Sequence, residues 1–291
     1  MKAALGIGRI VAVFAVILAS RSPALAYPGD PAAEAGAPSC ATPIALSAID
    51  AALDRSAARV QTGKPLTIVA MGSSSTKGVG ASTTALSYPS RLEQELRDRF
   101  PRVEIRVVNH GVGGQDVPEE LARIDRDVLA EHPDLVIWQV GTNAALRRDD
   151  LSADEQMIRR GIATMKEHGI DVLMMDLQYA PRVVARPASA EMERLIAEIA
   201  SYAHIGLFRR FEIMREWDRT QQLAPAAMIG PDGLHMTDAS YGCLANQLAE
   251  ALAWNWWTHA KLARSLHFIP DAIAEIDHRV AAQPGGVSRP R

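Results

Sequence analysis

Residues 66–78 read LTIVAMGSSSTKG, a mostly apolar run that ends in glycines and hydroxyl side chains. The run has the length of one strand and lacks the strict polar alternation of a strand with one solvated face. Such a run predicts a strand that is buried on both faces, as in parallel sheets covered by helices. The residues that follow it are therefore predicted to form a loop at the carboxyl end of the strand, where open parallel sheets bind ligands.

The pattern recurs along the chain. Further strands are predicted at 103–108, 135–140 and 172–177, with a weaker pattern near 205–208. Apolar residues at helical spacing predict helices around 46–53, 92–100, 118–130, 153–168, 190–203, 238–260 and 271–280. The alternation predicts one α/β domain with a three-layer α/β/α architecture and a central, mostly parallel five-stranded sheet.

The first 26 residues have the features of a secretory signal peptide. Lys2 and Arg9 precede an apolar run at 10–19, and 24–26 read ALA, small residues suited to a cleavage site. The run is about half the ~20 residues of a membrane-spanning helix, so cleavage is expected rather than anchoring. We therefore expect an exported protein, periplasmic or secreted, with an extended lead-in at 27–43, a domain at 44–265, and a short helix and disordered tail at 266–291.

Composition limits the classes of partner. The 291 residues are 48% hydrophobic and 22% charged, which is typical of globular proteins, and the formal net charge is −3. Removal of the leader takes away three basic residues and leaves 28 basic against 34 acidic ones. Neither nucleic acid nor anionic lipid is an expected partner, and no stable membrane insertion is expected after cleavage.

The two cysteines, Cys40 and Cys243, are candidates for a disulfide because an exported protein matures in an oxidising compartment. Two free thiols are the alternative. The sequence contains no HExxH motif or other cluster with metal-ligand spacing, so no metal is expected.

Groups suited to acyl transfer occur in four loops. Hydroxyl residues follow the first predicted strand, a glycine-rich turn at 109–115 follows the second, and Gly141-Thr142-Asn143 follows the third. Asp232 and His235 precede the last long helix. A histidine can take the proton of a serine hydroxyl, an aspartate can orient that histidine, and amide N–H groups can stabilise an oxyanion.

In these four blocks the sequence resembles the SGNH (GDSL-type) hydrolases, over most of the mature chain. The resemblance implies a flavodoxin-like SGNH hydrolase fold, Ser74 as nucleophile, and Asp232 and His235 as the rest of a triad. It also implies an oxyanion hole formed by the N–H groups of Ser74 and Gly114 and the side chain of Asn143. Ser73 stands where the family has aspartate, and Ser73 and Ser75 are the rival nucleophiles.

Other motifs fit less well. Lys77 precedes Gly78 instead of following it, unlike a phosphate-binding P-loop, and Asp116 replaces the third glycine of a dinucleotide fingerprint. The nucleophile elbow of α/β-hydrolases, GxSxG, requires a glycine where this sequence has Thr76. A flavin-type phosphate loop leaves Asn143, Asp232 and His235 unexplained, so no cofactor is expected.

The predicted function is an exported serine esterase that removes O-acetyl or other short acyl groups from carbohydrate through an acyl-enzyme. One alternative is a lipase, lysophospholipase or thioesterase with the same triad, and another is a non-catalytic glycan-binding module on the same fold. His110 is expected to stabilise its turn. A Cys40–Cys243 bridge is expected to hold the lead-in against the helix after His235 and thereby brace that histidine.

Overall fold

The computed structural model describes residues 40–147 and 151–281. The predicted signal peptide at 1–26, the lead-in up to residue 39 and the last ten residues of the predicted tail lie outside the described residues. Within the described ranges, no helix combines the length and the apolar character needed to cross a membrane.

The central sheet has five strands in the order β2-β1-β3-β4-β5, and every neighbouring pair is parallel. The strands are β1 (Leu66–Gly72), β2 (Ile105–Gly111), β3 (Leu135–Gln139), β4 (Asp171–Met175) and β5 (Gly206–Phe208). Each coincides with a predicted strand to within about three residues, so the α/β class and the five-stranded parallel sheet are confirmed. All carboxyl ends of the strands therefore meet at one edge.

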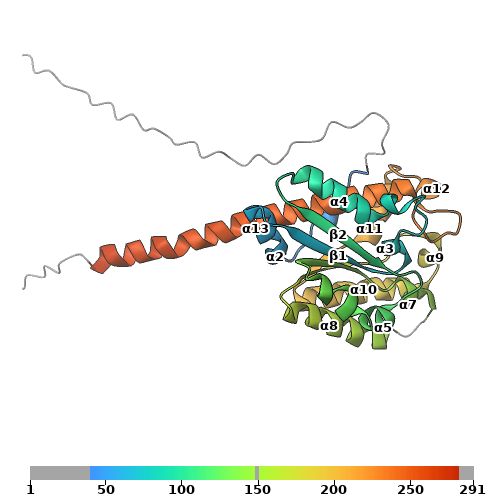
Figure 1. Cartoon of the computed structure of the whole chain (residues 1–291), viewed down its shortest axis with the longest axis horizontal. Helices are drawn as coiled ribbons and strands as arrows, with labels where there is room; N and C mark the ends of the chain where they lie inside the picture. The colour runs from blue at the N-terminus through green and yellow to red at the C-terminus, as the bar shows by residue number, and fades with distance from the viewer. Residues whose placement is uncertain (1–39, 148–150, 282–291) are drawn as a thin grey trace, which may run out of the picture. The chain divides into compact units, whose positions relative to one another are not determined.

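Helices cover both faces of the sheet (Figure 1), with α2, α4 and α13 on one face and α5, α8 and α10 on the other. The helices are α1 (Ile44–Ser47), α2 (Asp54–Thr62), α3 (Ser74–Lys77), α4 (Tyr88–Arg99), α5 (Val117–Leu121), α6 (Ile124–Asp127), α7 (Thr142–Arg147), α8 (Ser152–Glu167), α9 (Pro181–Val184), α10 (Pro187–Ala203), α11 (Arg210–Arg219), α12 (Pro225–Met228) and α13 (Asp238–Ala281), with 3₁₀ turns at Thr84–Leu86 and Leu129–Glu131. Proline occupies the first turn of α4, α9, α10 and α12. The N–H groups of a first turn have no acceptor within the helix, so proline, which lacks an N–H, fits there.

Four predicted helices differ from the structure. The helix expected at 46–53 is wrong, because the chain is non-helical between α1 and α2. There the buried amide of Asn255 donates to the carbonyls of Ile49 and Ala51 and accepts from the N–H of Leu53. These bonds give partners to backbone groups that have none within a helix. Ile49 and Leu53 are both buried, and their spacing of four residues resembles that of a helix.

The helix expected at 118–130 is divided into α5, α6 and a 3₁₀ turn. Arg123 interrupts it with a non-helical backbone, and its buried side chain donates to the carbonyls of Gly72 and His110 at the ends of β1 and β2. At the other end of the chain, the two helices expected at 238–260 and 271–280 form the single helix α13. The residues between them contain Pro270 but no glycine that would end a helix, and α13 runs through the proline.

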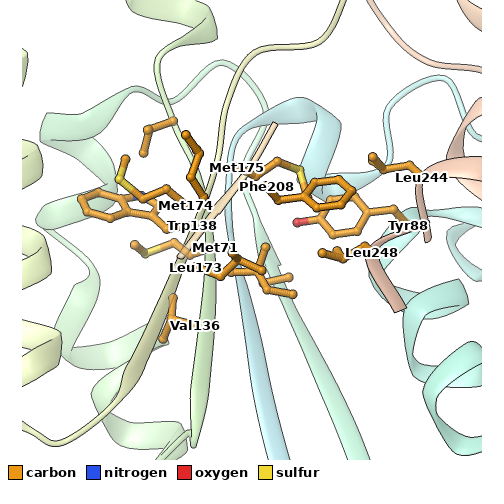
Figure 2. Close-up of a cluster of buried hydrophobic side chains, with 14 of the residues drawn as sticks. Met71, Tyr88, Val136, Trp138, Leu173, Met174, Met175, Phe208, Leu244 and Leu248 are labelled. Atoms are coloured by element: carbon orange, nitrogen blue, oxygen red, sulfur yellow. The ribbon is translucent and has the colours of Figure 1, made fainter. Parts of the chain in front are cut away.

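The core lies on both sides of the sheet. Trp138 and Met174 project from the strands toward one helical layer, and Tyr88, Leu244 and Leu248 pack against the other side (Figure 2). All five side chains are fully buried. The apolar strands thus form a rigid base from which the loops at the carboxyl edge extend.

A disulfide joins Cys40 to Cys243 of α13, with the two Cα atoms 5.5 Å apart. The carbonyl of Cys40 also accepts a hydrogen bond of 3.0 Å from Nε1 of the buried Trp217 in α11. The disulfide and this hydrogen bond therefore fix the start of the described chain to two helices, and the predicted pairing is present.

One buried carboxyl group belongs to the core. Glu120 is 1% exposed, and its Oε2 accepts a 2.8 Å hydrogen bond from Nε1 of Trp138. Burial raises the pKa of Glu120 to about 8, although the bond from Trp138 and the charge of Arg123 oppose the change. At neutral pH the folded state therefore favours the protonated acid.

Replacement of both Cys40 and Cys243 by serine should lower the free energy of unfolding by about 2–5 kcal/mol, because the unfolded chain loses the constraint of a large loop. Urea denaturation followed by circular dichroism under non-reducing conditions measures the change. Reductant should produce a similar loss in the wild type and none in the double variant. Equal urea midpoints for the oxidised wild type and the double variant would contradict a stabilising bridge.

Glu120→Gln should become progressively more stable relative to the wild type as the pH rises. A carboxyl with a raised folded-state pKa contributes stability that is fully present below its ordinary pKa of 4.5 and is lost as the pH rises through about 8. Glutamine retains an acceptor for Trp138 and does not ionise. Urea midpoints at pH 5 and pH 9 test this, with the exposed Glu104→Gln as control, and a constant difference between variant and wild type would contradict it.

Candidate active site

Ser74 is the first residue of α3, directly beyond the end of β1. It is partly exposed, whereas Ser73, Ser75 and Thr76 are buried. The hydroxyls of these three neighbours all donate to Oε1 of Gln139, at 3.0–3.2 Å. Ser73 and Ser75, the rival nucleophiles, therefore direct their hydroxyls into the protein, and the geometry favours Ser74.

Two glycines allow this turn to pack closely against its neighbours. A Cβ on Gly72 would lie 2.4 Å from Oγ1 of Thr76 and 2.9 Å from the Gln139 side chain. A Cβ on Gly111, at the end of β2, would lie 2.1 Å from the backbone nitrogen of Lys77. Both distances are far below a van der Waals contact, so any larger residue would displace α3 and with it Ser74.

The structure brings Ser74, His235 and Asp232 into one chain of hydrogen-bonding atoms. Oγ of Ser74 lies 2.8 Å from Nε2 of His235, and Nδ1 of His235 lies 2.5 Å from Oδ2 of Asp232. The other carboxylate oxygen of Asp232 accepts the backbone N–H groups of Leu234 and His235, each at 3.0 Å. Asp232 thus fixes the orientation of the His235 ring and the conformation of the loop that carries His235.

The environment of Asp232 favours its ionised form. Partial burial acts to raise its pKa, but the hydrogen bonds from the backbone of His235 and Leu234 and from the imidazole outweigh burial and lower the pKa to about 2. Asp232 is therefore ionised at neutral pH and can stabilise a positive charge on the His235 ring.

The loop that carries His235 is tied to the loop after α3. Asp238, the first residue of α13, accepts from the N–H and the hydroxyl of Ser82 at 2.8 and 2.6 Å. One turn later, the hydroxyl of Tyr241 donates to the carbonyl of Val79 at 2.7 Å. The start of α13, which also carries the disulfide, thus holds the two loops together, whereas bracing of His235 by the disulfide itself stays a prediction.

The other two predicted oxyanion donors, Gly114 and Asn143, lie on segments that contact each other. Nδ2 of Asn143, in the first turn of α7, donates to the carbonyl of Gln115 at 2.7 Å. Nη2 of Arg147, at the end of α7, donates to the carbonyl of Gly114 at 2.8 Å. A Cβ built on the adjacent Gly113 would lie 3.9 Å from Cβ of Ser74, so this glycine loop borders the serine.

Two contributors to the site are absent from the residues predicted from sequence. Gln139 is 1% exposed and accepts the three hydroxyls around Ser74. The second is Arg147, which donates to the carbonyl of Gly114. In the sequence, Gln139 stands out as an amide at the end of an otherwise apolar strand. Arg147 stands out because it lies one helical turn after Asn143. His110, which was expected to stabilise a turn, lies in β2, and its Nε2 is 3.3 Å from Oε1 of Glu131 in the 3₁₀ turn Leu129–Glu131.

Within the part of the chain that the structure describes, no group of three or more His, Cys, Asp or Glu side chains is arranged to hold a metal ion. The hydrogen-bonded chain of Ser74, His235 and Asp232 can perform acyl transfer with protein groups alone.

The fold resembles those of solved carbohydrate esterases. A two-domain esterase active on acetylated mannans superposes with a TM-score of 0.62 at 20% identity, over 72% of this chain and 56% of that one. Axe2, an acetylxylan esterase from Geobacillus stearothermophilus, superposes with a TM-score of 0.54 at 24% identity, over 66% of this chain and 95% of Axe2. At these identities the likeness concerns the fold.

Sequence comparisons add a family. A curated acetylxylan esterase from Geobacillus stearothermophilus is 41% identical over 56 residues, which is 19% of this chain and 26% of that protein. The chain thus matches about a quarter of the length of this relative, and about half of the mannan esterase. A model of the Non-GDSL lipase-like family matches residues 39–255, the range that contains all four loops of the site. In agreement with its resemblance to the SGNH hydrolases, the chain belongs to the Non-GDSL lipase-like family.

Proposed function

We propose that this protein is a serine esterase that removes acetyl or other short acyl groups from carbohydrate through an acyl-enzyme. The observation that carries the proposal is the continuous series of contacts from Oγ of Ser74 through His235 to the ionised Asp232. A serine hydroxyl is a weak nucleophile unless a base takes its proton, and here a histidine nitrogen lies within hydrogen-bond distance of it.

In the proposed first step, Oγ of Ser74 attacks the ester carbonyl while Nε2 of His235 takes the serine proton. The C–O bond to the alcohol then breaks, and His235 gives this proton to the leaving alcohol. In the second step, His235 takes a proton from water as the water oxygen attacks the acyl carbon. The bond between the acyl carbon and Oγ of Ser74 then breaks, His235 returns the proton to Oγ, and the acid leaves. Asp232 keeps Nδ1 of the ring protonated and stabilises the imidazolium in both steps.

Each step passes through a tetrahedral oxyanion, which needs donors. We assign these to the N–H of Ser74, the N–H of Gly114 and the side chain of Asn143. The N–H of Ser74 belongs to the first turn of α3, whose N–H groups an α-helix leaves without internal partners. The bonds from Asn143 to Gln115 and from Arg147 to Gly114 support the assignment, because they fix the orientation of the glycine loop.

The acetylated carbohydrate substrate is supported by the relatives. One is an acetylxylan esterase, and a structural neighbour is active on acetylated mannans. Export belongs to the same proposal: the first 26 residues have the pattern of a signal peptide, and disulfides such as Cys40–Cys243 persist in oxidising compartments. Ser73, which stands where the family has aspartate, donates to Gln139 and leaves Ser74 partly exposed.

Ser74→Ala should abolish hydrolysis of an activated acetate ester, with a fall in kcat on the order of 10⁶-fold, while the fold is retained. Covalent labelling by an organophosphonate, read by mass spectrometry, should add one label at Ser74 in the wild type. Ser73→Ala is the matched control, because it removes a neighbouring hydroxyl but not the nucleophile. Wild-type hydrolysis by Ser74→Ala would refute the assignment, and a folded wild type that takes no label would favour the glycan-binding module.

The value of kcat/KM should be highest for acetyl esters and should fall along a series from acetyl to decanoyl esters of one alcohol. Acetate should also be released from acetylated xylan or mannan oligosaccharides, and inactive Ser74→Ala serves as the blank. A maximum at long acyl chains would instead favour the lipase or thioesterase alternative.

A further inference from the structure

We propose that Arg210 and Gln178 are positioning residues that hold the loops of Ser74, Asn143 and His235 at fixed separations. This inference rests on the proposed esterase function, because it assigns those three residues to catalysis. The two side chains form a hydrogen-bonded pair, referred to below as the buried bridge, in which Nη2 of Arg210 donates to Oε1 of Gln178 at 3.0 Å. Arg210 is 0% exposed and Gln178 is 1% exposed.

One arm of the buried bridge reaches the nucleophile turn. Arg210 is the first residue of α11, and its Nη1 donates to Oγ of Ser75 at 3.0 Å. That hydroxyl in turn donates to Oε1 of Gln139, which also accepts the N–H of Ser73. The guanidinium group thus contacts the residue that directly follows Ser74 in the chain.

The other arms start from Gln178. Its Oε1 also accepts the hydroxyl of Thr142 at 3.1 Å, and its Nε2 donates to the carbonyl of Leu234 at 3.4 Å. Thr142 directly precedes Asn143, and Leu234 directly precedes His235. Each arm therefore ends one residue away from a proposed catalytic group, in three loops that are far apart in the sequence.

The buried bridge contains a charged group, the guanidinium of Arg210. Burial lowers the pKa of Arg210, and the charge of the nearby Asp176 opposes this change. Nη2 of Arg210 also donates to the carbonyl of Asp176 at 2.6 Å, and Oδ1 of Asp176 accepts the N–H of Phe211. Burial of a guanidinium carries a large desolvation cost, and apolar side chains of equal volume often serve stability as well or better. An apolar side chain has no directed donors, whereas the guanidinium of Arg210 has several and can form a rigid link.

Gln178→Met tests the inference, because methionine keeps the length and volume of the side chain and removes all three of its polar contacts. We expect kcat on an activated acetate ester to fall by about 10- to 100-fold, the size of effect that a small misplacement of catalytic groups produces. KM should change little, and organophosphonate labelling of Ser74 should slow in parallel with kcat.

Asn255→Leu is the matched control. Asn255 is also a buried amide, 1% exposed, with three hydrogen bonds to backbone groups. It serves the segment before α2, whose first turn bonds to Asp171 at the amino end of β4, opposite the site. Its loss should lower stability and leave kcat near the wild-type value. Equal falls in kcat for Gln178→Met and Asn255→Leu, or a wild-type kcat for Gln178→Met, would overturn the inference.

A conservative variant adds a second test. Gln178→Glu retains the oxygen acceptors for Arg210 and Thr142 and should keep a higher kcat than Gln178→Met, whereas equal values would count against the bridge. Ser74→Ala in the same assay separates the two proposals. If Ser74→Ala is inactive and Gln178→Met is fully active, only the proposal of the buried bridge is refuted. If Ser74→Ala is fully active, the proposed esterase function is refuted as well.

Discussion

Burial of a parallel sheet on both faces is the constraint on which the rest of this structure depends. The strands at its centre are apolar almost throughout, and helices exclude water from both sides. Polar chemistry can then enter only at the strand ends, and parallel pairing brings all the carboxyl ends to one edge. Ser74, the glycine turn, Asn143 and the polar groups after β4 all follow strands at this edge, so the location of the site follows from the hydrophobic pattern.

The same constraint explains what could be predicted from the sequence. Apolar runs of strand length predicted all five strands, and the order of four short blocks predicted Ser74, Asp232 and His235, which the structure brings into contact. These features are local in sequence. The contacts of Gln139 and Arg210 are not local, because their partners lie about 30 to 135 residues away, and a single glutamine or arginine carries no sign of them.

The errors in the predicted helices have a related cause. Ile49 and Leu53 have helical spacing, but the distant Asn255 supplies hydrogen bonds to the backbone around them, so a non-helical segment can be buried there. Arg123 likewise interrupts a helix and donates to carbonyls at the strand ends. In both places tertiary hydrogen bonds override a local pattern, because a buried backbone group needs a partner but not a helical one.

The disulfide has a topological consequence. Cys40 and Cys243 are 203 residues apart, and every strand of the sheet and every residue proposed for catalysis lies between them. These elements therefore belong to a single covalent ring. One proteolytic cut in a surface loop opens the ring without separating the molecule into two pieces, so the severed segments remain attached and can keep their native packing. Wherever a protease reaches such a loop, the closure would keep the cut molecule in one piece.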